Sequence, residues 1–200
     1  NSLMRFSKEE EYLRQKDKKL KKIIDMNGHI VFKPETKNQF DSLVGIVIAQ
    51  FISTKAANSI SHKIRENFRS EFLNPEHFKQ LSINEIKKLG LSTNKAKTIK
   101  ELSNLYLNKY LKDLTKLDEN KLNDKLLSVF GIGPWSVNMF EIFCIGKLDI
   151  FSSKDAGLRL AMENSDMVKP GSNWGAYDKY SERWSPFRTI ASIHLWKTVD

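Results

Sequence analysis

The sequence predicts an all-α fold of many short helices, and two observations carry that prediction. Apolar residues recur at spacings of three and four along most of the chain, which is the period of one helix face. No two strand-like runs are joined by an Asn-Gly or Gly-Gly turn, so a hairpin of strands is not expected. The 200 residues are 40% hydrophobic and 28% charged, which fits one globular domain or two small lobes that share a core.

The expected helices follow in chain order. Residues 16–22 form a lysine-rich run, expected on one amphipathic helix with an apolar side of Leu13, Leu20, Ile23 and Ile24. Residues 43–52 are rich in β-branched side chains, which favour strands. The length of this run and a polar lead-in at residues 38–41 that could cap a helix nevertheless predict a buried helix. Further helical periods cover residues 57–68, 95–111, 120–130 and 187–196.

The net charge is strongly positive. Lysine and arginine number 33 against 24 acidic residues, giving +9, which is typical of a protein that meets a polyanion. The excess is concentrated in residues 87–112, where seven lysines face the single acid Glu101. Such a run is either a solvated helix face or a nucleic-acid contact, and both interpretations stay open here.

The cysteine content excludes several classes of protein. The single cysteine, Cys144, cannot build a disulfide framework, a four-cysteine zinc site or an iron–sulfur cluster. No stretch has the length of a transmembrane span, and the N-terminus lacks the apolar run of a signal peptide. We therefore expect an intracellular protein, of bacterial cytoplasm or eukaryotic nucleus.

The most informative stretch is residues 126–137. One helix is expected to run into Gly131, which can take the left-handed conformation that ends a helix, and another to begin at Pro134. The Gly-Ile-Gly turn between them exposes backbone N–H groups at a helix N-terminus, where a phosphate oxygen can bind. A tight corner between two helices, without a ligand, explains the same residues equally well.

An acidic residue, Asp155, stands 22 positions after Gly133. Ser152 precedes it by three residues, so the two have the Ser-x-x-Asp form of a capping box. Taken alone, this capping role is the favoured explanation for Asp155.

In combination, these features resemble the helix-hairpin-helix/Gly-Pro-Asp family of DNA glycosylases. Four ordered motifs carry the resemblance: Ile-Ala-Gln-Phe-Ile-Ser-Thr-Lys-Ala-Ala at 48–57, Gly-Leu-Ser with Lys-Ala at 90–96, Gly-Ile-Gly-Pro-Trp at 131–135 with Asp155, and Arg-Trp-Ser-Pro-Phe-Arg with His-Leu-Trp within 183–196. The likeness covers roughly residues 15–197. It implies one glycosylase domain over residues 1–200, with two lobes and an active-site cleft between them. The hairpin would occupy about residues 122–146, and the Gln-containing loop and helix about 40–68.

Within this family the chain resembles the alkyl-base branch, 3-methyladenine DNA glycosylase II. Relatives that also cleave the strand carry a hairpin lysine as amine nucleophile, at the position of Trp135 here. The resemblance thus implies monofunctional hydrolysis of the N-glycosidic bond of alkylated bases such as 3-methyladenine, without lyase activity, in base excision repair. Two alternatives remain: a non-catalytic DNA-binding module, and the same fold acting on deaminated or mismatched bases.

The resemblance also implies a role for individual residues. Asp155 would be the catalytic carboxylate that stabilises a sugar oxocarbenium ion and orients water. Phe51, with Gln50 beside it, would fill the gap left by the flipped base; in the alternative interpretation Phe51 is a core residue. The base pocket would be formed by Trp135, Met139 and Trp196, the two tryptophans being core anchors in the alternative interpretation.

The remaining expectations concern ligands and partners. Contacts to DNA phosphates are assigned to Gly131, Gly133, Ser136, Lys95 and Lys97. No cofactor is required, but the hairpin could hold a monovalent cation, Na⁺ or K⁺, through the backbone carbonyls of Leu127, Val129 and Ile132. The expected partner is double-stranded DNA containing damaged bases, bound by a monomer and without a membrane.

Overall fold

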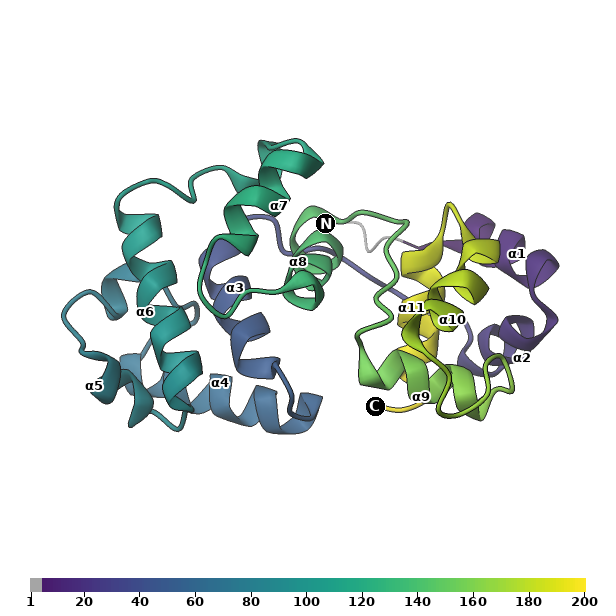
Figure 1. Cartoon of the computed structure of the whole chain (residues 1–200), viewed down its shortest axis with the longest axis horizontal. Coiled ribbons are helices and arrows are strands. Elements are labelled where there is room, and N and C mark those ends of the chain that lie inside the picture. Colours follow the sequence, from purple (N-terminus) through teal and green to yellow (C-terminus); the bar gives the residue numbers. More distant parts are fainter. Residues whose placement is uncertain (1–4) are drawn as a thin grey trace. The chain divides into compact units, whose positions relative to one another are not determined.

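The computed structural model describes residues 5–200, and over this range the predicted all-α fold is confirmed. The only β-type pairing among these residues is an isolated bridge between Arg5 and Val31. The chain divides into two compact units (Figure 1). The terminal unit combines the described residues up to Pro34 with Gly146–Asp200, and the central unit is Glu35–Ile145. Over residues 5–200, no helix combines the length and apolar character needed to cross a membrane.

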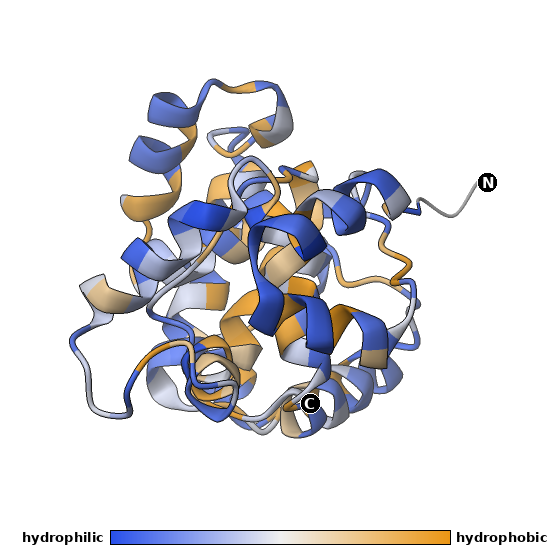
Figure 2. Cartoon of the chain, turned by 90° about the vertical axis from the view of Figure 1, so that its right-hand side faces the viewer, coloured by the Kyte–Doolittle hydropathy of each residue, from blue (hydrophilic) through white to orange (hydrophobic). Residues whose placement is uncertain are grey.

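The terminal unit joins the two ends of the described chain. Its helices are α1 (Ser7–Lys16), α2 (Lys18–Asn27), α9 (Ala156–Asn164), α10 (Trp174–Ser181) and α11 (Arg188–Lys197). Helix α11, drawn in yellow in Figure 1, packs against α9, α2 and α1. The helices turn apolar faces inward and hydrophilic faces outward, as the colours of Figure 2 show. The largest fully buried side chains of this core are Trp184, Tyr177, Leu13, Leu20 and Ile24.

The lysine-rich segment does not form the single helix that the sequence predicts. The chain breaks at Asp17, which has extended backbone angles and caps α2 by accepting hydrogen bonds from the backbone of Lys19 and Leu20. Its second carboxylate oxygen accepts from the indole of the buried Trp184 at 2.8 Å. These hydrogen bonds stabilise the break between α1 and α2. The lysines around Asp17 give no sign of this break in the sequence.

A buried polar network ties α1 to α11. Glu10 and His194 are both fully buried, with His194 Nε2 2.6 Å from Glu10 Oε2. The side-chain nitrogen of Asn27 donates to the His194 carbonyl and lies 3.0 Å from His194 Nδ1. Because a carbonyl only accepts, the Asn27 amide nitrogen faces Nδ1, which must then be the unprotonated nitrogen. The remaining ring proton is then on Nε2, which donates to Glu10, and burial lowers the pKa of His194.

The central unit contains the helices α3 (Gln39–Ala49), α4 (Thr54–Phe68), α5 (Ile83–Lys87), α6 (Thr93–Leu107), α7 (Glu119–Leu127) and α8 (Pro134–Phe140). Helix α3 packs against α4, α6 and α8. Because neighbours cover most of its surface, its β-branched residues are buried in a helix, as predicted. Asn38 stands at the N-cap without a side-chain cap, and Asp41 instead binds Arg65 and the Leu73 backbone.

The other predicted helices of this unit are present with shifted ends. The 57–68 helix begins three residues earlier at Thr54, because the Ser53 hydroxyl caps it. The 95–111 and 120–130 helices end at Leu107 and Leu127. After α8 the chain widens into a π-helical turn, Glu141–Ile145, that includes the buried Cys144. Burial raises the pKa of this thiol to about 12, so it stays protonated.

Candidate functional site

Asp155 caps helix α9 by itself. It occupies the N-cap position, with its Oδ1 accepting from the Leu158 backbone at 2.8 Å. The predicted capping box, with Ser152 as the N-cap, is therefore wrong. Ser152 Oγ is buried with no hydrogen-bond partner, and its carbonyl accepts from the Asp155 backbone N–H. The helix begins three residues later than the box requires, which places the carboxylate at the very start of α9.

The last helix also holds this carboxylate. Trp196, on α11, donates its indole N–H to the same Oδ1 at 2.9 Å. Gly157 lies beside the pair, where an added Cβ would stand 3.2 Å from Asp155 Oδ1 and 3.5 Å from the Trp196 ring. Two N–H donors on one oxygen fix the orientation of a half-exposed carboxylate at a helix N-terminus, where the helix dipole favours negative charge.

Sequence reasoning does not find this arrangement. The family resemblance implies a base-pocket role for Trp196 and leaves Gly157 unassigned. A glycine two residues after a helix N-cap is a usable signal of close packing, whereas nothing in the sequence indicates a hydrogen bond across 41 residues. Such a held anion can stabilise a developing positive charge without rearranging during the reaction.

The hairpin between α7 and α8 has two glycines with different constraints. Gly131 has a φ of +80°, and a Cβ there would stand 2.1 Å from the Thr98 hydroxyl, so only glycine fits. Gly133 is the N-cap of α8 with extended backbone angles, and a Cβ there would meet no atom within 4 Å. The turn therefore packs tightly at Gly131 and leaves open space at Gly133, before the N-terminus of α8.

The turn between α3 and α4 presents an aromatic ring to solvent. Phe51 has a left-handed backbone, with φ +60°, and its side chain is fully exposed. This conformation costs a non-glycine residue about 1–3 kcal/mol and persists only where surrounding contacts impose it. The alternative that Phe51 is a core residue is therefore wrong, and its exposure is consistent with a group that inserts into a partner.

Gln50 and Ser136 join this turn to the hairpin. Gln50 Nε2 donates to the Gly131 carbonyl and to the Ser136 hydroxyl, both at 2.9 Å. Ser136 is only 2% exposed. The hydroxyl is therefore engaged with Gln50 within the protein, and a phosphate contact of Ser136 stays a prediction that only its backbone N–H could fulfil. Of the two predicted gap-filling side chains, Gln50 is engaged within the protein, whereas Phe51 projects from it.

The two predicted phosphate-binding lysines on α6 differ in environment. Lys95 Nζ donates to the carbonyls of Ile48 and Gln50, both at 2.7 Å. Its predicted phosphate contact is not supported, since the ammonium group is committed to the end of α3. Lys97 is exposed, and its ammonium lies 6.0 Å from the centre of the Phe130 ring in the hairpin turn.

The predicted base-pocket residues lie in both units. Trp135 and Met139 are one turn apart on α8 of the central unit, with Trp135 half-buried and Met139 buried. Trp196 and Asp155 belong to the terminal unit. A pocket that combines the two sets, in a cleft between lobes, stays a prediction.

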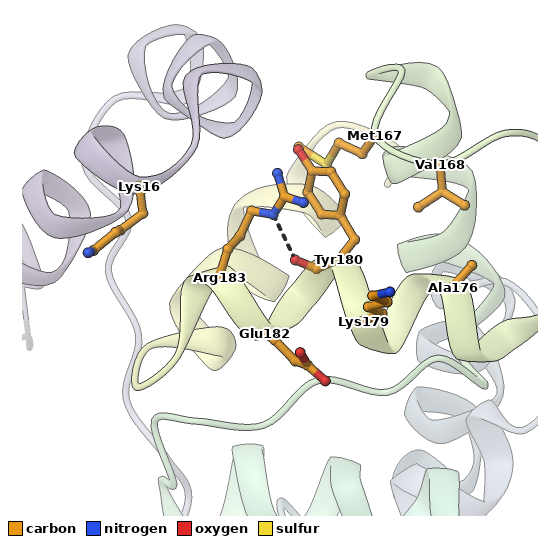
Figure 3. Close-up of a pocket in the computed structure, with 8 residues that line it drawn as sticks. All are labelled: Lys16, Met167, Val168, Ala176, Lys179, Tyr180, Glu182 and Arg183. Carbon is orange, nitrogen blue, oxygen red and sulfur yellow. Dashed lines mark hydrogen bonds between the residues drawn. The ribbon is translucent and has the colours of Figure 1, made fainter.

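An open depression of about 550 Å³ in the terminal unit contains none of the predicted site residues. Figure 3 shows Arg183 lying on the Tyr180 ring and bonded to the Tyr180 carbonyl at 3.0 Å. Three basic side chains and one acid line this space beside small apolar patches, and no group aimed into it suggests chemistry. Its lining consists of Lys16, Met167, Val168, Ala176, Lys179, Tyr180, Glu182 and Arg183.

Across residues 5–200, no group of three His, Cys, Asp or Glu side chains lies close enough together to hold a metal ion. In the hairpin, the Val129 carbonyl accepts from the Ile132 backbone at 3.1 Å and keeps a second lone pair. The monovalent cation predicted at the backbone carbonyls of Leu127, Val129 and Ile132 stays a prediction.

A helical hairpin with a Gly-x-Gly turn, followed by a carboxylate fixed at the N-cap of a later helix, defines the class of helix-hairpin-helix base excision proteins. Residues 44–186 match the family described as "HhH-GPD superfamily base excision DNA repair protein". The chain belongs to this superfamily, as the four sequence motifs predict.

Two curated relatives match almost the whole of this chain. DNA-3-methyladenine glycosylase 1 of Schizosaccharomyces pombe is 25% identical over 96% of this chain and 87% of its own. DNA-3-methyladenine glycosylase of Saccharomyces cerevisiae is 28% identical over 95% of this chain and 78% of its own. The structure of the S. pombe 3-methyladenine DNA glycosylase Mag1 in complex with abasic DNA superposes with a TM-score of 0.87 at 25% identity, covering 96% of each chain.

Proposed function

We propose that this protein is a monofunctional DNA glycosylase that removes alkylated bases, such as 3-methyladenine, from double-stranded DNA. One observation carries the proposal: the Asp155 carboxylate is fixed by the Leu158 backbone and the Trp196 indole. Two relatives named 3-methyladenine glycosylases support the substrate class, and the relative solved with abasic DNA supports DNA as the partner. The protein would act as a monomer and need no cofactor.

DNA binding precedes the chemistry. A base inside a duplex must rotate out of the stack before a side chain can reach its sugar. The exposed Phe51 ring would enter the gap and hold the neighbouring bases apart. The hairpin, through Gly131 and Gly133, and Lys97 would contact the phosphates. A monovalent cation on the carbonyls of Leu127, Val129 and Ile132 would add positive charge there.

The base pocket would recognise charge. Alkylated purines are cationic, and an aromatic face attracts a cation by about 0.5–2 kcal/mol. Trp135 and Trp196 would supply these faces, and Met139 a polarizable thioether. Neutral normal bases would bind these aromatic faces less strongly, because they lack the cation–aromatic attraction.

The reaction then needs one anion. Cleavage of the N-glycosidic bond leaves its electron pair on the departing base and positive charge on the sugar, and water adds at the sugar carbon and loses a proton. A carboxylate about 4 Å from that charge, at an effective dielectric constant near 20, contributes about 4 kcal/mol. This corresponds to roughly a thousandfold in rate. Asp155 would supply this charge and accept a hydrogen bond from the water.

The chemistry of the hairpin argues against a lyase activity. A lyase of this class attacks the sugar with an amine, and the corresponding side chain here is the indole of Trp135. Borohydride should therefore trap no covalent complex with DNA. A trapped adduct would show that another amine acts as nucleophile.

The test is base release from methylated duplex DNA by the wild type and by Asp155→Asn. The amide keeps the shape and the capping oxygen but removes the charge, so release should fall roughly a thousandfold. Binding to abasic-site DNA should stay within about threefold, because no phosphate contact changes. Near-normal turnover by the variant would refute the catalytic role. Chromatography that separates 3-methyladenine, 7-methylguanine and hypoxanthine would show whether alkylated or deaminated bases are preferred.

A further inference from the structure

A lysine of the neighbouring helix holds the backbone immediately before Phe51. Helix α3 ends at Ala49, and the last carbonyls of a helix have no partner within it. Lys95 Nζ donates to two carbonyls at this end, those of Ile48 and Gln50, at 2.7 Å each. A cation at a helix C-terminus also matches the negative end of the helix dipole.

The Lys95 ammonium is directed toward this turn by its own helix. Lys95 lies in the first turn of α6, and its backbone N–H donates to the N-cap hydroxyl of Ser92 at 3.2 Å. The residue is half-buried, and desolvation lowers the pKa of its amine. Lys97, two residues later, is exposed and meets the hairpin turn instead.

The bond to Gln50 determines where the next residue points. The Gln50 carbonyl oxygen lies in the peptide plane that joins Gln50 to Phe51, so a donor on that oxygen fixes the rotation of the plane. The Gln50 side chain is anchored independently to Gly131 and Ser136. Gln50 is therefore held at both its side chain and its carbonyl. These bonds restrict rotation of the 50–51 peptide plane, and the restricted plane keeps Phe51 in its left-handed conformation.

We propose that Lys95 is a positioning residue for Phe51: it aims the exposed ring at the gap in DNA and makes no phosphate contact. This inference rests on the proposed role of Phe51 as the gap-filling side chain. Without the ammonium, the 50–51 peptide can rotate and Phe51 can leave its strained conformation. Displacing a positioned group by about an ångström can cost up to a hundredfold in rate. The loss of rate should affect the step in which the Phe51 ring replaces the rotated base.

The experiment compares Lys95→Met with Lys97→Met, Phe51→Ala and the double variant of Lys95 and Phe51. Single-turnover release of 3-methyladenine is measured from a paired site and from an unpaired bulge, where unstacking costs less. We expect Lys95→Met to lose roughly tenfold on the paired site and less than about twofold on the bulge. Adding Lys95→Met to Phe51→Ala should cause no further loss, because both act through one ring.

Salt dependence separates positioning from phosphate binding. The log–log slope of DNA affinity against salt should be unchanged in Lys95→Met and should fall by up to about one unit in Lys97→Met. A drop of one unit in Lys95→Met would overturn the proposal, as would equal losses on paired and bulged sites. If Lys95→Met does not fold, Lys95→Gln is used, and the same slope and the same paired-to-bulged ratio decide.

A binding signal keeps the test independent of catalysis. 2-Aminopurine placed opposite an abasic site reports insertion of the Phe51 ring by its fluorescence, without any base being released. Lys95→Met should reduce this change as Phe51→Ala does, and an unchanged signal would overturn the proposal. Failure of the proposed function would show separately, as absence of base release by the wild type.

Discussion

The hydrogen bond from Trp196 to Asp155 gives the sharpest prediction. Trp196→Phe keeps an aromatic ring but removes the indole N–H that lies 2.9 Å from Asp155 Oδ1. The bond from the Leu158 backbone remains, so the carboxylate keeps one of its two donors on this oxygen. The variant therefore separates the orienting role of Trp196 from its role as a pocket wall.

The expected loss follows from the strength of the bond. A hydrogen bond to a charged group contributes about 1.5–3 kcal/mol. If the whole contribution is expressed in the transition state, kcat falls by roughly ten- to 150-fold. Because Asp155 acts on the sugar, the loss should be the same for cationic 3-methyladenine and neutral hypoxanthine. Trp196→Ala should lose more on 3-methyladenine, by the further 0.5–2 kcal/mol or so of a cation–aromatic contact.

The assay is single-turnover release of each base, with abasic-DNA affinity and the thermal midpoint measured on the same samples. A normal kcat in Trp196→Phe would refute the reasoning and show that α9 alone orients Asp155. A fall in the thermal midpoint with equal losses for both bases in Trp196→Ala would show that Trp196 is a core anchor.

Two further predictions concern the hairpin and the buried histidine. Gly131→Ala should destabilise the fold by roughly 2–5 kcal/mol, because Gly131 has a positive φ and a Cβ there overlaps Thr98. Gly133→Ala should leave the thermal midpoint nearly unchanged and weaken binding to all DNA. Equal thermal midpoints for the two variants would contradict this prediction. Because burial lowers the pKa of His194, the unfolded state binds more protons below the ordinary value of 6.5, so the free energy of unfolding should fall as pH drops from about 7 to 5. His194 faces Glu10, Asn27, Lys197 and Arg14, and His194→Gln should flatten this dependence in urea titrations.

The periodicity of apolar residues predicts the helices well, but not their breaks. The helices predicted at residues 43–52 and 187–196 are present as Gln39–Ala49 and Arg188–Lys197, because apolar residues there recur every three or four positions, but the first ends three residues before the predicted boundary. The break at Asp17 depends on a bond to Trp184, which is 167 residues away. No local pattern records such a partner.

In the candidate site, too, some features can be predicted from the sequence and others depend on packing. The Gly-Ile-Gly turn and Asp155 can be found in the sequence because their spacing is local or typical of the family. Lys95 and Lys97 have the same charge and stand two residues apart, yet one caps α3 and the other is exposed. The direction of each side chain depends on how α6 packs against α3, and the charge pattern of the sequence does not give this packing.

The order in which the chain is made bears on when the protein becomes active. The central unit is complete once residue 145 has been synthesised, whereas the terminal unit needs α11 to pack against α1 and α2. Glu10 and His194, which meet in that unit, are 184 residues apart in the chain. A ribosome therefore exposes the hairpin and the Phe51 turn before Trp196 can reach Asp155. A chain interrupted before α11 would retain the elements proposed to bind DNA but lack the bond from Trp196 to Asp155. Such an unfinished product would bind a damaged site without releasing the base.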